Sequence, residues 1–352
     1  MTHFSRPAPQ ALWGVAIFAL IAIVGLFYVK WAPYYGRAFV AADTHSIGHS
    51  ILTGANAAPP APSLAAALDY AWAYGLAIWK ALVLGLLLGS AIQALVPRRW
   101  VMRVLGGTGV GSVVAGGMLS VPSMMCTCCS APVINGLRQQ RAASGSTVAF
   151  WLGNTMLNPA TLVFMGFVLG WHWVGLRLGV GIVMVFGLGW ILNRMSQARG
   201  DCAPRVPVKD AFVDGAEPGM FVRWLRSLTR MTLQLLPEYL VIVLLLGAAR
   251  AWLFPALDVG VDNSLLWIVG LAIAGMLFVI PTAGEVPIVQ AALSLGMAAG
   301  PAAALLVTLP PISLPSLAMV YRSFRRTELA LLMGGVVALG VGAAGLAIAL
   351  GF

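Results

Sequence analysis

Charged residues are scarce in this chain. Only 9% of its 352 residues are charged, whereas 60% are hydrophobic. A soluble domain of this length could not bury so much apolar surface, so the composition excludes a soluble globular protein and predicts a polytopic membrane protein. The sequence also lacks a glycine-rich phosphate loop of the Walker type and a large polar domain. These absences argue against an ATP-driven pump contained in a single chain.

Acidic residues are rarer than basic ones, at 11 against 21, which gives a net charge of +10. The basic residues gather in short loops between apolar runs, as the positive-inside rule predicts for cytoplasmic loops, so we infer no nucleic-acid partner. Nine apolar segments are separated by these loops. They span residues 11–31, 66–97, 108–137, 147–168, 171–194, 229–253, 264–295, 301–320 and 327–350. The first is longer than a signal-peptide core, and we expect it to be retained as a helix.

Segment 108–137 has arginines on both flanks, Arg103 before it and Arg138 after it. If both flanks are cytoplasmic, a single crossing would put one of them on the wrong side. We therefore expect a re-entrant hairpin that enters from the cytoplasm and returns to it. Two arms of about 14 residues would each be about 20 Å long. Its turn, at Pro122–Pro132, would then lie near the middle of a hydrocarbon core about 30 Å thick.

The second half of the chain repeats this pattern. Pro132-Val-Ile matches Pro287-Ile-Val, and each precedes an apolar segment interrupted by polar residues and proline, at 154–159 and 310–315. Segment 264–295 then corresponds to 108–137, with Pro281–Pro287 as its turn.

Each half would contain three crossings and one hairpin, and because three is an odd number, the halves would be inverted. We thus predict an all-α membrane protein with seven crossings, two re-entrant hairpins, the N-terminus inside and the C-terminus outside. The expected divisions are 1–65 (an extra N-terminal helix and an external segment), 66–194 (first repeat), 195–228 (cytoplasmic linker) and 229–352 (second repeat).

This architecture indicates transport. Non-helical backbone in lipid leaves peptide groups unpaired, and it is tolerated where it is buried in protein or lines a wet cavity. Inverted repeats whose broken helices meet at mid-membrane are typical of secondary transporters. Helix N-termini at such a site can hold an anion, and free carbonyls can hold a cation.

The main candidate ligands are three thiols between Pro122 and Pro132: Cys126, Cys128 and Cys129. Thiolates bind soft centres such as trivalent arsenic or Cu(I). In an extended turn, Cys126 and Cys128 would place their sulfurs on one side, and Cys129 could complete a trigonal set. Two alternatives stay open. The cysteines could pack as small apolar residues, or they could form a strained, easily reduced redox pair.

Other polar residues of the turns and broken helices are candidates for the same site. Glu285 lies in the second turn, where an intramembrane carboxylate could carry a coupling proton or cap a half-helix. Asn154, Asn158 and Ser313 could contact substrate or pair the backbone freed by nearby prolines. Within the apolar runs, Lys80 and Arg177 could snorkel or line a wet cleft, with Glu238 as an ion-pair partner for one of them.

The cysteine motif also carries a family resemblance. Cys126–Pro132 resembles the Cys-Ser-Cys-Gly-x-x-Pro element of a bacterial and archaeal permease family that includes the organoarsenical (methylarsenite) efflux permeases. Asn158-Pro159 resembles the Asn-Pro of that family, and residues 284–290 and 314–316 resemble its second-half elements. The resemblance covers about residues 75–350.

This chain departs from the pattern at two positions, with Thr127 in place of serine and Cys129 in place of glycine. The resemblance implies a permease of the cytoplasmic (inner) membrane more firmly than it implies an arsenic substrate.

We therefore predict a secondary permease, not an enzyme, that moves a small thiophilic solute by alternating access. The predicted partners are a small molecule or ion, membrane lipid and a coupling proton, with no cofactor or resident metal, and a homo-oligomer stays open. The alternatives are a membrane thiol–disulfide electron carrier and a channel-like pore. An electron carrier usually has one cysteine in each half, and this chain has none in its second half.

Overall fold

The computed structural model describes residues 9–48, 50–51, 60–198, 219–254 and 261–352, and these form helices joined by short turns. Most of the linker expected at residues 195–228 lies outside these residues, and so does Cys202. The helices are α1 (Pro9–Leu26), η1 (Phe27–Trp31, a π-helical turn), α2 (Ala32–Thr44), α3 (Leu64–Ala94), α4 (Arg98–Leu105), α5 (Val110–Ser120), α6 (Thr127–Gln139), α7 (Ser144–Met156), α8 (Pro159–Val168), α9 (Trp171–Ile182), η2 (Val183–Leu188, π-helical), α10 (Gly189–Ala198), α11 (Met220–Leu253), α12 (Leu265–Leu277), α13 (Glu285–Ser294), α14 (Ala299–Thr308), α15 (Leu314–Val320) and α16 (Arg326–Leu350).

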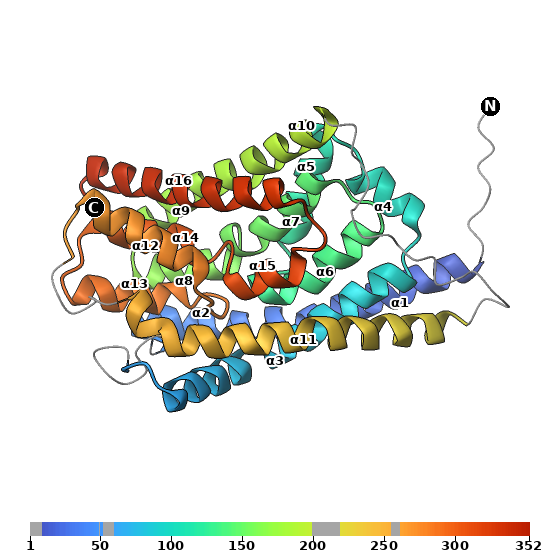
Figure 1. The fold of residues 1–352 in the computed structure, drawn as a ribbon, viewed down its shortest axis with the longest axis horizontal. Coiled ribbons are helices and arrows are strands. Elements are labelled where there is room, and N and C mark those ends of the chain that lie inside the picture. The colour runs from blue at the N-terminus through green and yellow to red at the C-terminus, as the bar shows by residue number, and fades with distance from the viewer. Residues whose placement is uncertain (1–8, 49, 52–59, 199–218, 255–260) are drawn as a thin grey trace.

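Five of the described helices are long and apolar enough to cross a membrane. They are Trp13–Thr44, Leu64–Ala94, Trp171–Ala198, Met220–Leu253 and Arg326–Leu350. They run along the long axis of the molecule and surround the shorter helices (Figure 1). The protein is thus an all-α polytopic membrane protein, as predicted from its composition.

Two pairs of short helices lie at the segments for which the sequence predicts hairpins. In the first, α5 and α6 are joined by residues 121–126, and in the second, α12 and α13 are joined by residues 278–284. The first turn is shorter than expected, because α6 begins at Thr127, and the second lies earlier in the chain than expected, because α13 begins at Glu285. A short helix not expected from the sequence, α4, precedes the first pair and meets α5 at an angle of 109°.

A broken helix follows each hairpin. In the first half, α7 ends at Met156 and α8 begins at Pro159; in the second, α14 ends at Thr308 and α15 begins at Leu314. Proline explains both breaks, because it has no backbone N–H and disfavours helical conformation in the residue before it. The order long helix, hairpin, broken helix, long helix therefore recurs, while the inversion of the two halves stays a prediction.

The N-terminal helix is longer than the sequence suggested. Helical backbone continues past Trp31 to Thr44. Pro33 is tolerated there because the helix is already remodelled by the π-turn η1 just before it. This helix packs against α3 and, through α2, against α8.

Each hairpin also contacts the half of the chain to which it does not belong. Helix α6 of the first hairpin packs against α15, and α13 of the second packs against α8. Short helices from both halves therefore meet in the middle of the molecule.

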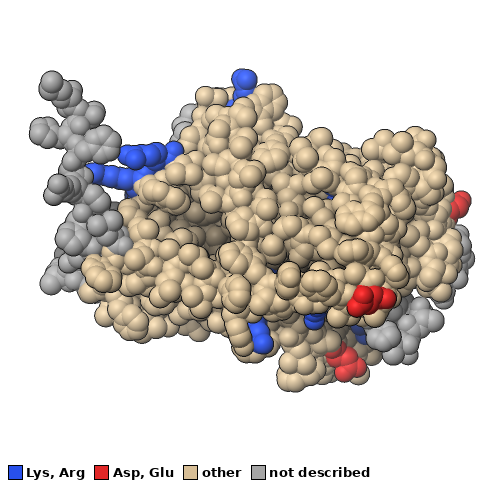
Figure 2. Space-filling view, turned by 180° about the vertical axis from the view of Figure 1, so that it is seen from behind, with Lys and Arg blue, Asp and Glu red and all other residues tan. Residues whose placement is uncertain are grey.

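The charge distribution follows the long axis. Helix α4, the end of α10 and the start of α11 lie at one end, and they carry Arg98, Arg99, Arg103, Arg194, Arg223, Arg226 and Arg230 (Figure 1). On the face shown in Figure 2, acidic side chains lie only in the right half, and uncharged residues cover most of the surface. Large exposed apolar side chains, such as Trp72, Leu233 and Leu266, suit contact with lipid.

Candidate functional site

The first hairpin turn places the three cysteines at the start of a helix. Pro122 interrupts α5, and Met124 reverses the chain with a left-handed φ of 47°. Cys126 is extended and immediately precedes α6, so Cys128 and Cys129 lie in the first helical turn. All three thiols are buried and free.

Helical geometry decides how these cysteines pair. Residues three apart share a helix face, and Cys126 Sγ lies 2.7 Å from Cys129 Sγ. Cys128 points elsewhere, with its Sγ 3.6 Å from Ser313 Oγ and 3.7 Å from the Tyr74 hydroxyl. The expected pairing of Cys126 with Cys128 is therefore wrong, because it assumed an extended backbone.

Asn154 of α7 holds the first turn in place. Its Oδ1 accepts hydrogen bonds from the Met125 N–H, at 3.1 Å, and from the Ser123 hydroxyl, while its Nδ2 donates to Phe150 O at 2.7 Å. These bonds satisfy backbone groups that the hairpin turn leaves without helical partners. Asn154 thus positions the cysteine turn.

Asn158 and Ser313 occupy equivalent places before α8 and α15. The Asn158 Oδ1 caps α8 by accepting from Ala160 N at 3.1 Å and Thr161 N at 3.3 Å. Ser313 forms a capping box with Ser316, and its hydroxyl lies 3.1 Å from Thr127 Oγ1. Ser313 therefore links the second broken helix to the first hairpin as well as capping α15.

The second hairpin turn ends at Glu285, which forms a buried ion pair. Glu285 Oε1 lies 2.6 Å from Arg177 Nη1, and the two side chains are 2% and 0% exposed. Arg177 Nη2 also donates to Thr155 O at 2.8 Å. Glu285 Oε2 and Arg177 Nε are buried with no hydrogen-bond partner among the described residues. Glu238, proposed from the sequence as a partner for Arg177 or Lys80, instead pairs with Arg322 at 3.0 Å on the surface.

Sequence reasoning missed Lys30, which lies in the π-turn of the N-terminal helix and is only 3% exposed. Its Nζ donates to Tyr34 Oη at 3.2 Å and to Thr282 Oγ1 at 3.1 Å. Its neighbour Trp31 donates from Nε1 to Pro122 O at 2.7 Å. The N-terminal helix therefore touches both hairpin turns. The only signal in the sequence was a lysine near the end of the first apolar run, where the ammonium group usually reaches water.

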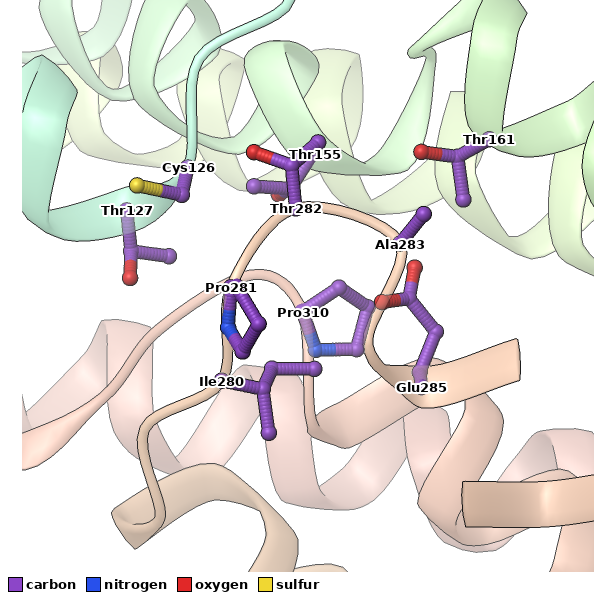
Figure 3. Close-up of a pocket in the computed structure, with 10 residues that line it drawn as sticks. All are labelled: Cys126, Thr127, Thr155, Thr161, Ile280, Pro281, Thr282, Ala283, Glu285 and Pro310. Carbon is purple, nitrogen blue, oxygen red and sulfur yellow. The ribbon is translucent and has the colours of Figure 1, made fainter. Parts of the chain in front are cut away.

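A small cavity lies between the two turns. Figure 3 shows the loop of Pro281, Thr282 and Ala283 arching between Cys126 and Thr127 on one side and Glu285 on the other. The lining residues come from both hairpins and both broken helices. They are Cys126, Thr127, Thr155, Thr161, Ile280, Pro281, Thr282, Ala283, Glu285 and Pro310.

The cavity, of about 10 Å³, has room for one water molecule at most, so a bound solute would require the two turns to move apart. Of the predicted site residues, Cys126 and Glu285 line it. Ser313 contacts the lining residue Thr127, while Asn154 and Asn158 support the surrounding turns. Cys128 and Cys129 lie behind the lining, in the first turn of α6.

Comparisons with known proteins identify the family of the chain. The chain matches the family described as "Predicted permease" over residues 11–153 and 123–349. It is 50% identical over 340 residues to the UPF0718 protein YraQ of Escherichia coli (strain K12), covering 97% of this chain and 96% of that protein. No solved structure matches the chain. The apolar helices and these two matches together show that this integral protein of the bacterial inner membrane belongs to the predicted permease family.

Proposed function

We propose that the protein is a secondary permease that moves a small thiophilic solute across the membrane by alternating access. The observation that carries the proposal is the cavity between the hairpin turns, which both halves of the chain line and which holds a buried thiol and a buried carboxylate. Soft trivalent centres bind thiolates, and the Cys126–Cys129 pair lies at the edge of this cavity.

The ion pair Arg177–Glu285 supplies a means of coupling. It joins α9 of the first half to α13 of the second, and the free Oε2 of Glu285 can accept a proton. Protonation would remove the charge that Arg177 pairs with and so weaken the contact between the halves. A proton gradient could then drive the change between inward-open and outward-open states.

The test is uptake and exchange in proteoliposomes with arsenite, methylarsenite, Cu(I) and thiosulfate, with and without an imposed pH gradient. We expect at least one of these solutes to be transported, and faster with the gradient. The double variant Arg177→Gln, Glu285→Gln keeps the cavity without its charges, so it should exchange solute but lose gradient-driven transport. The absence of transport for the whole panel would count against the permease.

A thiol–disulfide carrier is the second candidate, and one observation favours it. Cys126-Thr-Cys-Cys129 has the Cys-x-x-Cys spacing of redox motifs, and it lies at a helix N-terminus, as redox-active cysteines often do. A carrier would trap a mixed disulfide with a thioredoxin-like partner when Cys129 is replaced by serine. If such a complex is trapped and no solute is transported, the carrier hypothesis would be supported and the permease hypothesis would be contradicted.

A further inference from the structure

The N-terminal helix, made of α1, η1 and α2, lies outside the repeated pattern, yet it contacts both halves of the chain. Only 11% of its most apolar stretch is buried, so most of its surface can face lipid. Two neighbouring side chains of the π-turn η1, Lys30 and Trp31, instead reach the two hairpin turns. A π-turn inserts an extra residue into a helix, and such insertions are frequent at functional sites.

Each of these two side chains holds one turn. Trp31 Nε1 donates to Pro122 O in the first turn at 2.7 Å, and Lys30 Nζ donates to Thr282 Oγ1 in the second at 3.1 Å. The Pro122 carbonyl lies beyond the end of α5, at Ser120, where a chain leaves its regular helical hydrogen bonds. Lys30 is 3% exposed, so loss of its bond to Thr282 would remove a partner from a buried ammonium group.

The same helix is fixed to other elements around the cavity. Its α2 part packs in an apolar cluster with Phe164 of α8 and Ala283 of the second turn. At its end, His45 Nδ1 lies 2.8 Å from Phe167 O of α8, and Gln290 Nε2 of α13 donates to His45 O at 3.0 Å. The N-terminal helix is thus attached to α8, the second turn and α13, and Trp31 joins this group to the turn that carries the cysteines.

These bonds restrain the movement that solute binding needs. The cavity between the turns has room for about one water molecule, so a solute can enter only if the turns separate. Separation moves Pro122 away from Thr282, and these two residues are held by adjacent residues of one helix. That helix can follow one turn but not both, so one of the two bonds must break.

We propose that the N-terminal helix is a strap, in which Lys30 and Trp31 are positioning residues that hold the two hairpin turns together until the site opens. This inference rests on the proposed permease function, because alternating access is what requires the turns to separate. Lys30 acts in it through its hydrogen bond to the second turn and not by contact with the solute. The helix outside the repeats thereby controls access to the site that the repeats form.

The experiment measures how fast N-ethylmaleimide labels the purified full-length chain in nanodiscs. A Cys202→Ser background leaves the three buried thiols of the first turn as reporters, and they react when the turn opens. Trp31→Phe removes the indole donor and keeps a ring, and Thr282→Val removes the acceptor of Lys30 and keeps the shape. The matched controls are Trp13→Phe, on the same helix but 68% exposed, and Thr161→Val, which lines the cavity from α8.

We expect Trp31→Phe and Thr282→Val each to raise the labelling rate about fivefold, as loss of one hydrogen bond would, and the controls to change it less than twofold. The double variant should label no faster than the faster single variant, because a strap released from one turn no longer holds the other against it. Either single variant labelling like its control would overturn the strap, and so would effects that multiply in the double variant.

A distant reporter detects general loosening of the protein. Ala304 of α14 is fully buried in a separate apolar cluster. In a cysteine-free background, Ala304→Cys should label at the same rate with and without Trp31→Phe. A rise there equal to the rise at the first turn would overturn the strap, because the substitution would then have loosened the whole molecule.

Transport separates this inference from the proposed function, because labelling needs no solute. If the solutes are transported but both variants label like their controls, the permease stands and the strap is overturned. If the variants label as expected but none of the solutes is transported, the strap stands as a restraint on the turns and the permease fails.

Discussion

Arg177 and Glu285 differ in how they tolerate the loss of their partner. Both are withdrawn from water, on α9 and at the start of α13. A carboxylate left alone can take up a proton and become neutral, whereas an arginine keeps its charge. If Glu285 is removed, Arg177 therefore stays charged and is left without compensation.

This asymmetry predicts unequal effects on stability. Glu285→Gln should destabilise the protein by about 3–5 kcal/mol, as expected for an uncompensated buried charge, and Arg177→Gln by less. The double variant should be close to the original chain. Glu238→Gln, which removes an exposed pair with Arg322, should cost less than about 1 kcal/mol. Thermal unfolding in a mild detergent measures the series, and a double variant as unstable as Glu285→Gln would show that the two charges do not compensate each other.

The cysteines have distinct surroundings and should respond differently to substitution. Cys126 and Cys129 form the close pair, whereas Cys128 contacts Ser313 and Tyr74. Cys126→Ser and Cys129→Ser should each reduce binding of a soft solute at least about tenfold, because a hydroxyl is a poor ligand for a soft centre. Cys128→Ser should have a smaller effect. Equal losses for all three, measured by arsenite binding, would support a trigonal thiol set instead.

At this scale, the sequence identified polar residues in and around the two turns but not their contacts. The Cys126–Cys129 pair depends on α6 beginning at Thr127, and helix boundaries are the least certain part of a sequence-based reading. Lys30 could not be recognised as buried, because a lysine near the end of an apolar run usually reaches water with its ammonium group. The π-turn that carries Lys30 has no sequence signature.

Close packing of α3 against α6 positions the cysteine helix. A Cβ atom added at Gly85 would meet the carbonyl oxygen of Cys129, and one at Gly89 would meet that of Pro132. These glycines let the two backbones approach closely, a common device in membrane helix packing. The cysteines therefore depend on α3 as well as on their own hairpin.

A pair of valine substitutions on α3 tests this dependence. Gly85→Val should push α6 away and destabilise the protein by about 1–3 kcal/mol, with faster labelling of the buried thiols. Gly75→Val is the matched control, because a Cβ there meets no atom within 4 Å. Both changes alter helix propensity alike, so the difference in melting temperature and labelling rate reports the contact. Equal behaviour of the two variants would contradict it.

At the scale of elements, the arginine flanks of the first hairpin, the internal repeat and the prolines were sufficient to predict where the two pairs of short helices and the two broken helices occur. What they could not give was the length of the N-terminal helix. The first apolar run ends at Trp31 and suggested that the helix ends there, but tertiary contacts of α2 with α8 keep the chain helical to Thr44. Packing outweighs local propensity there.

For the whole molecule, the contacts between halves are reciprocal. The first hairpin packs on the second broken helix through α6 and α15, and the second hairpin packs on the first broken helix through α13 and α8. Such an exchange is what a pseudo-twofold axis in the membrane plane would produce. Such an axis requires the two hairpins to enter the membrane from opposite sides. This part of the inverted-repeat prediction still needs a direct test.

Site-directed labelling with a membrane-impermeant thiol reagent provides that test. In a cysteine-free background, single cysteines would replace Arg103 and Arg141, which flank the first hairpin, and Asp262 and Gly296, which flank the second. All four positions are exposed, unlike Arg138, whose guanidinium is buried against Ser323 and Ala142.

We expect Arg103→Cys and Arg141→Cys to react only from the cytoplasmic face, because positive-inside loops flank that hairpin. Asp262→Cys and Gly296→Cys should react only from the opposite face. Intact cells and inverted vesicles give the two orientations, and permeabilised membranes control for reactivity. Labelling of positions 103 and 141 from opposite faces would mean that α5 and α6 cross the membrane once. That result would contradict the inverted repeat, and it would also contradict alternating access between two inverted halves.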